Sequence, residues 1–358
     1  MSSRPPLRAL LLALLASLAA ATPLRAQAPA ASHVPLVQGV EALCLPVADL
    51  ERSIAFFTEV LEFRLVARHE VEGERWERFL AVFPLRLEIA VLSLGDERLE
   101  LWQYWAPHAS DANGTVQPND AAFQHIAIVV SDMARAYAKL RAHRVRHASS
   151  GPQRLPDWNP NAGGIEAFYF RDPDLHYLEL IAFPPGKGEE RWQAKDRLFL
   201  GIDHTAIAVA DTERSLAFYR DALGFRVAGT SENHGHEQER LNGVFASRVR
   251  ITTLRAPRGP GIELLEYLAP GAGRPLDERR RANDLGAWQI RLAADPERAA
   301  VAARPFATLG PRSPGVATLG EAPLGFVSVA LFGDPDGHLL QASSIPPTGP
   351  RASACLGR

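Results

Sequence analysis

Alternating apolar and polar residues predict a strand from Asp203 to Ala210. Asp211 comes next, a residue type that favours the N-cap of a helix, and the pattern after it predicts a helix that runs to Leu223. Gly224 then stands where the end of a helix favours a left-handed residue. Three further strands follow, so this part of the chain is predicted to form a βαβββ module.

The chain repeats itself at an offset of 162 residues. Residues 47–57 match residues 209–219, and far downstream Asp172-Pro173-Asp174 matches Asp334-Pro335-Asp336 in the same register. A register held over this length is not chance similarity. The sequence therefore predicts two homologous halves.

Each half divides again, because the strand pattern that opens a module restarts at 123–132 and at 287–292. The chain is thus predicted to be an α+β protein of four βαβββ modules. We expect two tandem domains at 38–184 and 199–345, joined by a Pro- and Gly-containing linker at 185–198.

The two ends of the chain are expected to lie outside these domains. A basic start that ends at Arg8 precedes an apolar run from Ala9 to Ala21, which is too short to span a bilayer comfortably. The small residues of Ala26-Gln27-Ala28 then resemble a cleavage site, so residues 1–28 are predicted to be a secretory signal peptide. We expect a secreted or periplasmic protein without a membrane anchor after cleavage, and a disordered tail at 346–358.

Length and charge narrow the class of protein. A mature chain of about 330 residues is too long for one hydrophobic core, which favours two domains. The formal net charge of −2 gives no basic surface for nucleic acid, so a small molecule is the expected partner. With two cysteines, the chain has no disulfide framework. Its oligomeric state is not determined by these features.

Three motifs resemble the vicinal-oxygen-chelate superfamily, which comprises the glyoxalase, bleomycin-resistance and extradiol-dioxygenase fold. They are a His on a strand before Ile-Ala, as at His125, the helix Arg-Ser-x-Ala-Phe-(Phe/Tyr)-x-x-x-Leu at 52–61 and 214–223, and the turn Asp-Pro-Asp-x-His-x-Leu-(Glu/Gln) at 172–179 and 334–341. The resemblance spans residues 38–345. It specifies the fold more narrowly than the reaction.

The resemblance also implies where a metal is held. In this superfamily two modules close into a cup, and each supplies one ligand from its first strand and one Glu from its last. The second module offers His125 and Glu179, and the third offers His204 and Glu263, whereas the first and fourth modules offer incomplete sets. These incomplete sets are Ala42 with Glu100, and Trp288 with Gln341.

Two pairings of the modules are open. If modules pair within each half, neither cup holds two histidines. If the second module pairs with the third, one cup gathers His125, Glu179, His204 and Glu263, and we favour this arrangement because it collects every good ligand. Two imidazoles with one or two carboxylates suit a divalent transition metal, here Fe, Mn, Zn or Ni.

The expected function is that of a metal-dependent enzyme acting on a small substrate with vicinal oxygens. Glu179 and Glu263 are the expected catalytic proton carriers of a glyoxalase-like lyase or isomerase. The same ligands equally suit a ring-cleaving dioxygenase. The alternative is a metal-free binding or sequestration protein of the bleomycin-resistance type, in which Trp288 offers a stacking surface.

Other polar residues are expected to have structural or peripheral roles. His176 and His338 follow the Asp-Pro-Asp turns and are interpreted as structural. The segment His234-Gly235-His236-Glu237 is interpreted as a solvated loop beside the substrate entrance rather than a metal site. The Pro-bounded loop 154–161 either gates a pocket or packs as ordinary surface.

Overall fold

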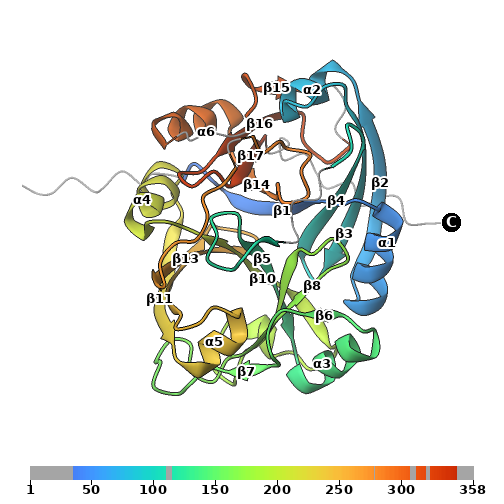
Figure 1. The fold of residues 1–358 in the computed structure, drawn as a ribbon. Coiled ribbons are helices and arrows are strands. Elements are labelled where there is room, and N and C mark those ends of the chain that lie inside the picture. The colour runs from blue at the N-terminus through green and yellow to red at the C-terminus, as the bar shows by residue number, and fades with distance from the viewer. Residues whose placement is uncertain (1–34, 110–114, 278, 307–311, 320–322, 345–358) are drawn as a thin grey trace, which may run out of the picture. The chain divides into compact units, whose positions relative to one another are not determined.

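The computed structural model describes residues 35–109, 115–277, 279–306, 312–319 and 323–344. The predicted signal peptide and tail therefore lie outside the described residues. Within these ranges the strands form two curled mixed sheets, as Figure 1 shows. No helix in them is long and apolar enough to cross a membrane.

The eight-stranded sheet, which we call sheet A, is made of the first and fourth modules. Its strands in spatial order are β15 (Ala317–Thr318), β16 (Ser328–Gly333), β17 (Leu339–Ser343), β14 (Gln289–Ala293), β1 (Gly39–Pro46), β4 (Glu97–Ala106), β3 (Arg86–Leu94) and β2 (Arg64–Glu72).

The nine-stranded sheet, sheet B, is made of the second and third modules. Its order is β11 (Arg226–His234), β12 (Arg248–Arg255), β13 (Gly261–Ala269), β10 (Phe199–Ala208), β5 (Gln124–Val130), β9 (Tyr177–Ala182), β8 (Glu166–Arg171) and β6 (Arg146–His147), with β7 (Gln153–Arg154) also paired to β8. The second module thus pairs with the third, through the antiparallel strands β5 and β10. Each half of the sequence repeat contributes one module to each sheet, and the domain limits proposed above stay a prediction.

The helix of the third module begins at the cap that the sequence predicts. In the third module the Asp211 side chain accepts a hydrogen bond of 2.9 Å from the backbone N–H of Arg214, and Gly224 is left-handed with φ +84°. The predicted single helix is in fact α4 (Thr212–Leu216) continued by the π-helical turn η4 (Ala217–Ala222). The other helical segments are α1 (Leu50–Ala55), η1 (Phe56–Val60), α2 (Glu74–Leu80), α3 (Met133–Ala142), η3 (Glu190–Gln193), α5 (His236–Asn242), α6 (Pro296–Ala303) and η5 (Arg304–Phe306).

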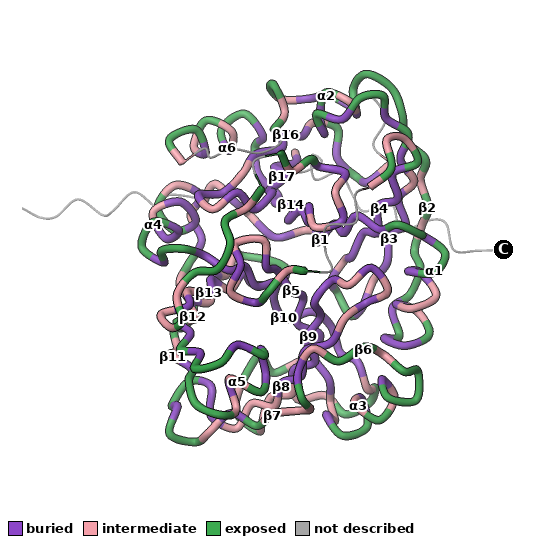
Figure 2. Tube along the Cα trace, in the orientation of Figure 1, coloured by how far each residue is buried: buried purple, intermediate pink, exposed green. Residues whose placement is uncertain are grey.

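Alternate residues of the strands face different cores. The largest apolar cluster takes residues from both sheets, among them Leu43, Ile128, Leu180 and Leu292. The residues between them point to the opposite face of each sheet, which is where a cup would form. Figure 2 shows that residues of the central strands are buried and that exposed residues are frequent on the helices.

Candidate metal centre

The four predicted ligands lie on four adjacent strands in the middle of sheet B. Glu179 on β9 and His204 on β10 both pair with Ala127 of β5, which lies between them. His125 on β5 and Glu263 on β13 both pair with Ala206 of β10 in the same way. The small alanines leave room for the longer side chains to converge over the same face of the sheet.

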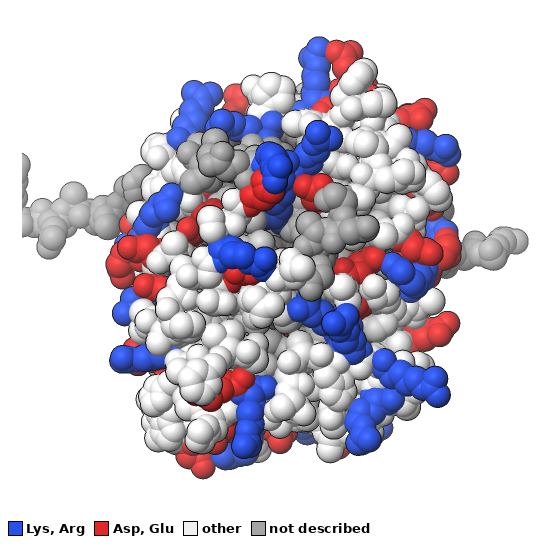
Figure 3. All heavy atoms as spheres, viewed as in Figure 1, with Lys and Arg blue, Asp and Glu red and all other residues white. Residues whose placement is uncertain are grey.

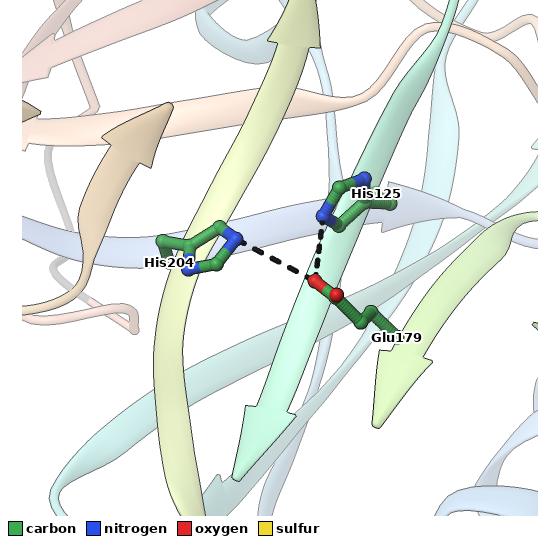
Figure 4. Close-up of side chains that lie close together, drawn as sticks. All are labelled: His125, Glu179 and His204. Atoms are coloured by element: carbon green, nitrogen blue, oxygen red, sulfur yellow. Dashed lines mark ion pairs between the residues drawn. The ribbon is translucent and has the colours of Figure 1, made fainter. Parts of the chain in front are cut away.

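Three of these side chains meet at one point, as Figure 4 shows. Glu179 Oε2 lies 3.0 Å from His125 Nε2 and 3.6 Å from His204 Nε2. One ligand atom from each of the three lies within 4.8 Å of the others. Glu263 borders this cluster, with its Oε2 3.3 Å from His204 Nε2.

The ring nitrogens that face the cluster fit a metal. Both histidines are nearly completely buried, yet Nε2 of His125 and Nε2 of His204 have no aligned hydrogen-bond partner among the described residues. The short contact of His125 with Glu179 lacks hydrogen-bond geometry. Buried polar atoms are rarely left in this state without a ligand or water. Atoms that share a metal at about 2.0 to 2.2 Å lie about 3 to 4 Å apart, which matches the contacts above.

His204 is held in place by a neighbouring acid. Its Nδ1 lies 2.8 Å from Asp203 Oδ2, while Asp203 Oδ1 accepts hydrogen bonds from Trp192 Nε1 at 2.9 Å and Arg255 Nη2 at 2.7 Å. A carboxylate on one ring nitrogen orients the other toward a metal. The predicted linker 185–198 is therefore part of the site, because it contains η3, and the buried Trp192 of η3 donates to Asp203.

The electrostatics of the centre favour a positive charge. Burial lowers the pKa of His204, but the carboxylates of Glu263, Asp203 and Glu179 outweigh burial and raise this pKa to about 9. The pKa of Asp203 is correspondingly held below its usual range, because its contacts with His204 and Arg255 outweigh burial. In the absence of a metal, a proton on His204 supplies the charge that these carboxylates require.

Two further residues next to the glutamates were not found by sequence reasoning. Thr253 donates a hydrogen bond of 2.7 Å to Glu263 Oε1. The Tyr169 ring lies 4.9 Å from that of His125, and burial raises the pKa of its hydroxyl, which keeps it a neutral donor. Their positions opposite the two glutamates follow from strand register, which the sequence pattern does not give. For Asp203 the sequence does contain a signal, because an acidic residue stands within a buried strand next to His204.

A cavity of about 830 Å³ extends from this cluster. We call it the open cup; it is lined by the inner faces of sheet B, by α5 and by the loop 155–165. That loop contains most of the predicted segment 154–161 and borders the cavity, since Leu155, Pro160 and Asn161 line it. Asn159 Nδ2 donates a hydrogen bond of 2.7 Å to Asn233 Oδ1 of β11, so the loop joins two edges of sheet B.

The histidine-rich segment before α5 is not a loop. β11 ends at His234, Gly235 is left-handed with φ +93°, and α5 starts at His236. His234 stacks on Trp158 with a ring distance of 4.4 Å. No metal-ligand cluster occurs at this junction within the described ranges.

His176 also lies outside the centre. Its Nδ1 is 2.7 Å from Asp172 Oδ2 and its Nε2 is 2.9 Å from the Leu285 carbonyl. Both contacts are with acceptors, and His338 makes the equivalent contact of 3.0 Å with Asp334. These histidines hold the turns that precede β9 and β17.

The corresponding face of sheet A is filled, and we call it the filled cup. Apolar residues, including Ala42, Trp76, Phe79 and Trp102, form a buried cluster there. Within it Glu100 accepts two hydrogen bonds from Arg291, whose side chain is 1% exposed.

The assignment of Trp288 to this cup was wrong. In β14, Gln289 pairs with Leu339, and in β5, His125 pairs with Tyr177. Tyr177 and Leu339 are equivalent residues of the repeat. Gln289 therefore holds the ligand position, and its Oε1 accepts a hydrogen bond of 2.6 Å from Gln341. Since neighbouring strand residues face opposite sides, Trp288 points into the main core, 5.0 Å from the His176 ring, and offers no stacking surface in the cup.

Charged residues of both signs are interspersed on the face shown in Figure 3. Some of the cations at the entrance of the open cup are already paired: Arg191 lies 2.5 Å from Glu97 and 2.7 Å from Glu189. Arg226 and Arg258 also line the cavity, and both are exposed.

The sequence of the chain is similar to those of known proteins. A sequence model of the Glyoxalase/Bleomycin resistance protein/Dioxygenase superfamily matches residues 39–180 and 201–342. Glyoxalase I of Saccharomyces cerevisiae is 27% identical over 216 residues, which are 56% of this chain and 60% of the yeast protein, less than two thirds of its length. The 2-epi-5-epi-valiolone epimerase of Actinomyces sp is 32% identical over 170 residues, 46% of this chain and 90% of that protein.

A similar fold is found among solved structures. Glyoxalase I from Zea mays superposes with a TM-score of 0.53 at 18% identity, and the superposition covers 86% of this chain and 92% of the maize chain. At this level of identity the likeness concerns the fold alone.

Proposed function

The chain belongs to the Glyoxalase/Bleomycin resistance protein/Dioxygenase superfamily, and on this premise we propose that it is an exported, metal-dependent lyase or isomerase acting on a small molecule with two adjacent oxygen atoms. The observation that carries the proposal is the meeting of His125, Glu179 and His204 at one buried point of the open cup. Glu263 at its border supplies a second carboxylate.

His125, Glu179, His204 and Glu263 are the residues that would hold the metal, which is Fe, Mn, Zn or Ni. When bound, such an ion stabilises the negative charge that develops on the substrate oxygens as a neighbouring carbon loses a proton. Four protein donors of nitrogen and oxygen type are suited to all of these ions.

The two glutamates divide the proton transfers. They come from β9 and β13, on opposite sides of the histidine strands, so one can remove a proton from carbon and the other can return one. Thr253 holds Oε1 of Glu263, which leaves Oε2 as the oxygen that carries the proton. Tyr169 stays protonated and is placed to donate a hydrogen bond to a substrate oxygen.

A ring-cleaving dioxygenase is the second candidate, and one observation favours it. The tightest group of donors contains two histidines and one glutamate, the set that ferrous oxygenases use, with Glu263 outside it. Glu263 would then be a base near the substrate rather than a ligand. The names of the two relatives above, a glyoxalase and an epimerase, support the first candidate.

Metal content and solvent exchange test the proposal together. The purified chain should contain a transition metal that is lost in the double variant His125→Ala/His204→Ala. The loaded protein should incorporate deuterium from D₂O next to the carbonyl of an α-hydroxycarbonyl substrate such as lactoylglutathione. Oxygen consumption with a catechol and no exchange would favour the dioxygenase. A metal-free protein that binds small aromatics would show that it is a binding protein instead.

Export is tested separately. A fusion of residues 1–40 to a periplasmic reporter should be processed and exported, and a Leu11→Arg/Leu14→Arg variant should retain the reporter inside the cell, because charges interrupt the apolar run.

A further inference from the structure

The filled cup serves as an internal reference for the open cup, because α2 and α5 occupy the same place in their modules, 162 residues apart. Both helices bury three side chains. In α2 these are apolar: Trp76, Phe79 and Leu80. In α5 the equivalent residues are Gln238, Leu241 and Asn242.

In α5, Gln238 and Leu241 take the places that Trp76 and Phe79 have in α2. The open cup therefore lacks the two aromatic side chains that fill the other cup. Trp76 and Phe79 contact each other there at a ring distance of 5.8 Å, inside the apolar cluster. Gln238 and Leu241 instead line the open cup together with the metal centre. α5 thus presents a polar group toward any ligand that extends from the metal centre.

The two amides on α5 have different environments. Asn242 is saturated: its Oδ1 accepts from the Val244 N–H at 2.9 Å, and its Nδ2 donates to Ser247 at 3.2 Å and Tyr267 at 3.3 Å. Gln238 is 4% exposed, and its Oε1 has no hydrogen-bond partner among the described residues. Leaving a buried acceptor unpaired is unfavourable, and folding alone gives no reason to place a glutamine there.

We propose that Gln238 is a specificity-determining residue which binds an uncharged hydroxyl or amide group of the substrate, so that the substrate carries such a group beyond the two oxygens at the metal centre. The proposal rests on the proposed function for the location of the reacting end. The amide places an NH₂ donor group and a carbonyl acceptor side by side, which matches a group that both donates and accepts. A hydrocarbon ring in the same place would leave the amide unsatisfied.

The surrounding wall is consistent with a neutral polar ligand. Ser231 of β11 lines the cavity on the same strand face as its partner Ile251, and Asn161 lines it from the facing loop. Asn161 is partly committed, because its Nδ2 donates to the Thr230 carbonyl at 2.6 Å. Apolar residues such as Ile181 and Leu265, on the strands that carry Glu179 and Glu263, also line the cavity.

A matched pair of probes tests this inference by calorimetry. scyllo-Inosose and 2-hydroxycyclohexanone share one ring and one hydroxyketone, and they differ in their remaining hydroxyls. The parent chain should bind scyllo-inosose at least about tenfold more tightly, and Gln238→Leu should lose most of this preference while its affinity for 2-hydroxycyclohexanone is retained. Failure of either probe to bind, equal affinities in the parent, or an unchanged preference in Gln238→Leu would overturn the proposal.

Stability provides a control within the same helix. Gln238→Leu should keep or raise the melting temperature, because it removes an unpaired acceptor, whereas Asn242→Leu should lower it by breaking the hydrogen bonds of the Asn242 side chain. A fall for Gln238→Leu as large as that for Asn242→Leu would assign Gln238 to structure alone. Repeating the calorimetry after EDTA treatment separates this proposal from the proposed function. If the metal is removed and the preference for scyllo-inosose is retained, the result counts against the proposed function and leaves the role of Gln238 intact.

Discussion

Arg291 and Glu100 form a two-pronged ion pair inside sheet A, with Nη1 to Oε2 at 2.8 Å and Nη2 to Oε1 at 2.6 Å. Arg291 is the repeat equivalent of Ala127 and pairs in register with Ala42, whereas Ala127 pairs with His204 in sheet B. The open cup thus has His204 opposite Ala127, whereas the filled cup has Ala42 opposite Arg291. The guanidinium supplies the positive charge that Glu100 requires.

We expect about one metal ion per chain, because the carboxylate of Glu100 in the filled cup is already paired. Glu100 already accepts hydrogen bonds from Arg291 and, at 3.2 Å, from Trp102 Nε1, and it forms an ion pair with Arg98 at 2.7 Å. Plasma emission spectrometry of the purified protein should therefore give one equivalent in the parent and in Gln341→Ala. His204→Ala should give less than a tenth of an equivalent, and two equivalents in the parent would contradict this account.

Loss of one partner of the buried pair should be strongly destabilising. Arg291→Met leaves the Glu100 carboxylate buried without its main partner, and we expect it to lower the free energy of unfolding by roughly 3–5 kcal/mol. The double variant Arg291→Met/Glu100→Leu should recover a large part of that loss, because no unpaired carboxylate remains. Urea unfolding of the parent and both variants measures this. Equal losses in the single and double variants would mean that packing, and not charge, dominates.

Asp203→Asn should weaken metal binding about 10- to 100-fold while the fold is kept. The amide cannot accept the His204 proton as the carboxylate does, so the ring loses the contact that directs Nε2 toward the centre. Competition with a chromophoric chelator gives the affinity. Trp192→Phe, which removes one hydrogen bond to Asp203 and keeps the ring, should have a smaller effect in the same direction. Unchanged affinity in Asp203→Asn would show that His204 needs no orienting partner.

The stability of the protein should depend on pH through His176. Burial lowers the pKa of this ring, but its contacts with Asp172 and with the Leu285 carbonyl outweigh burial and raise the pKa in the folded state. A raised folded pKa gives stability that is fully present below the unfolded value of about 6.5 and is lost as pH rises through the folded value.

Urea unfolding at a series of pH values from 6 upward tests this sign. The free energy lost by His176→Gln should be largest at pH 6 and should shrink as pH rises, when both proteins are compared in the same metal state. A difference that is constant over the series, or that grows with pH, would refute it.

Much of this protein follows from the pattern of its residues. The repeat, the βαβββ order and the helix cap at Asp211 are local features, set by periodicity and by side chains that bond their own backbone, so the α+β fold and the family were predictable. His125, Glu179, His204 and Glu263 were also identifiable, because each stands at an equivalent place in a repeated motif, although their role as ligands stays a prediction.

Tertiary structure decided what these residues form together. Both pairings of the modules satisfy the same local patterns, and only the packing of β5 on β10 puts His125 and His204 in one cup. Register had the same effect at β14, where a shift of one residue replaced Trp288 by Gln289 and turned the indole into the core. The unpaired amide of Gln238 and the ion pair of Arg291 with Glu100 depend on atoms brought together from distant segments, and a chain pattern contains no such distances.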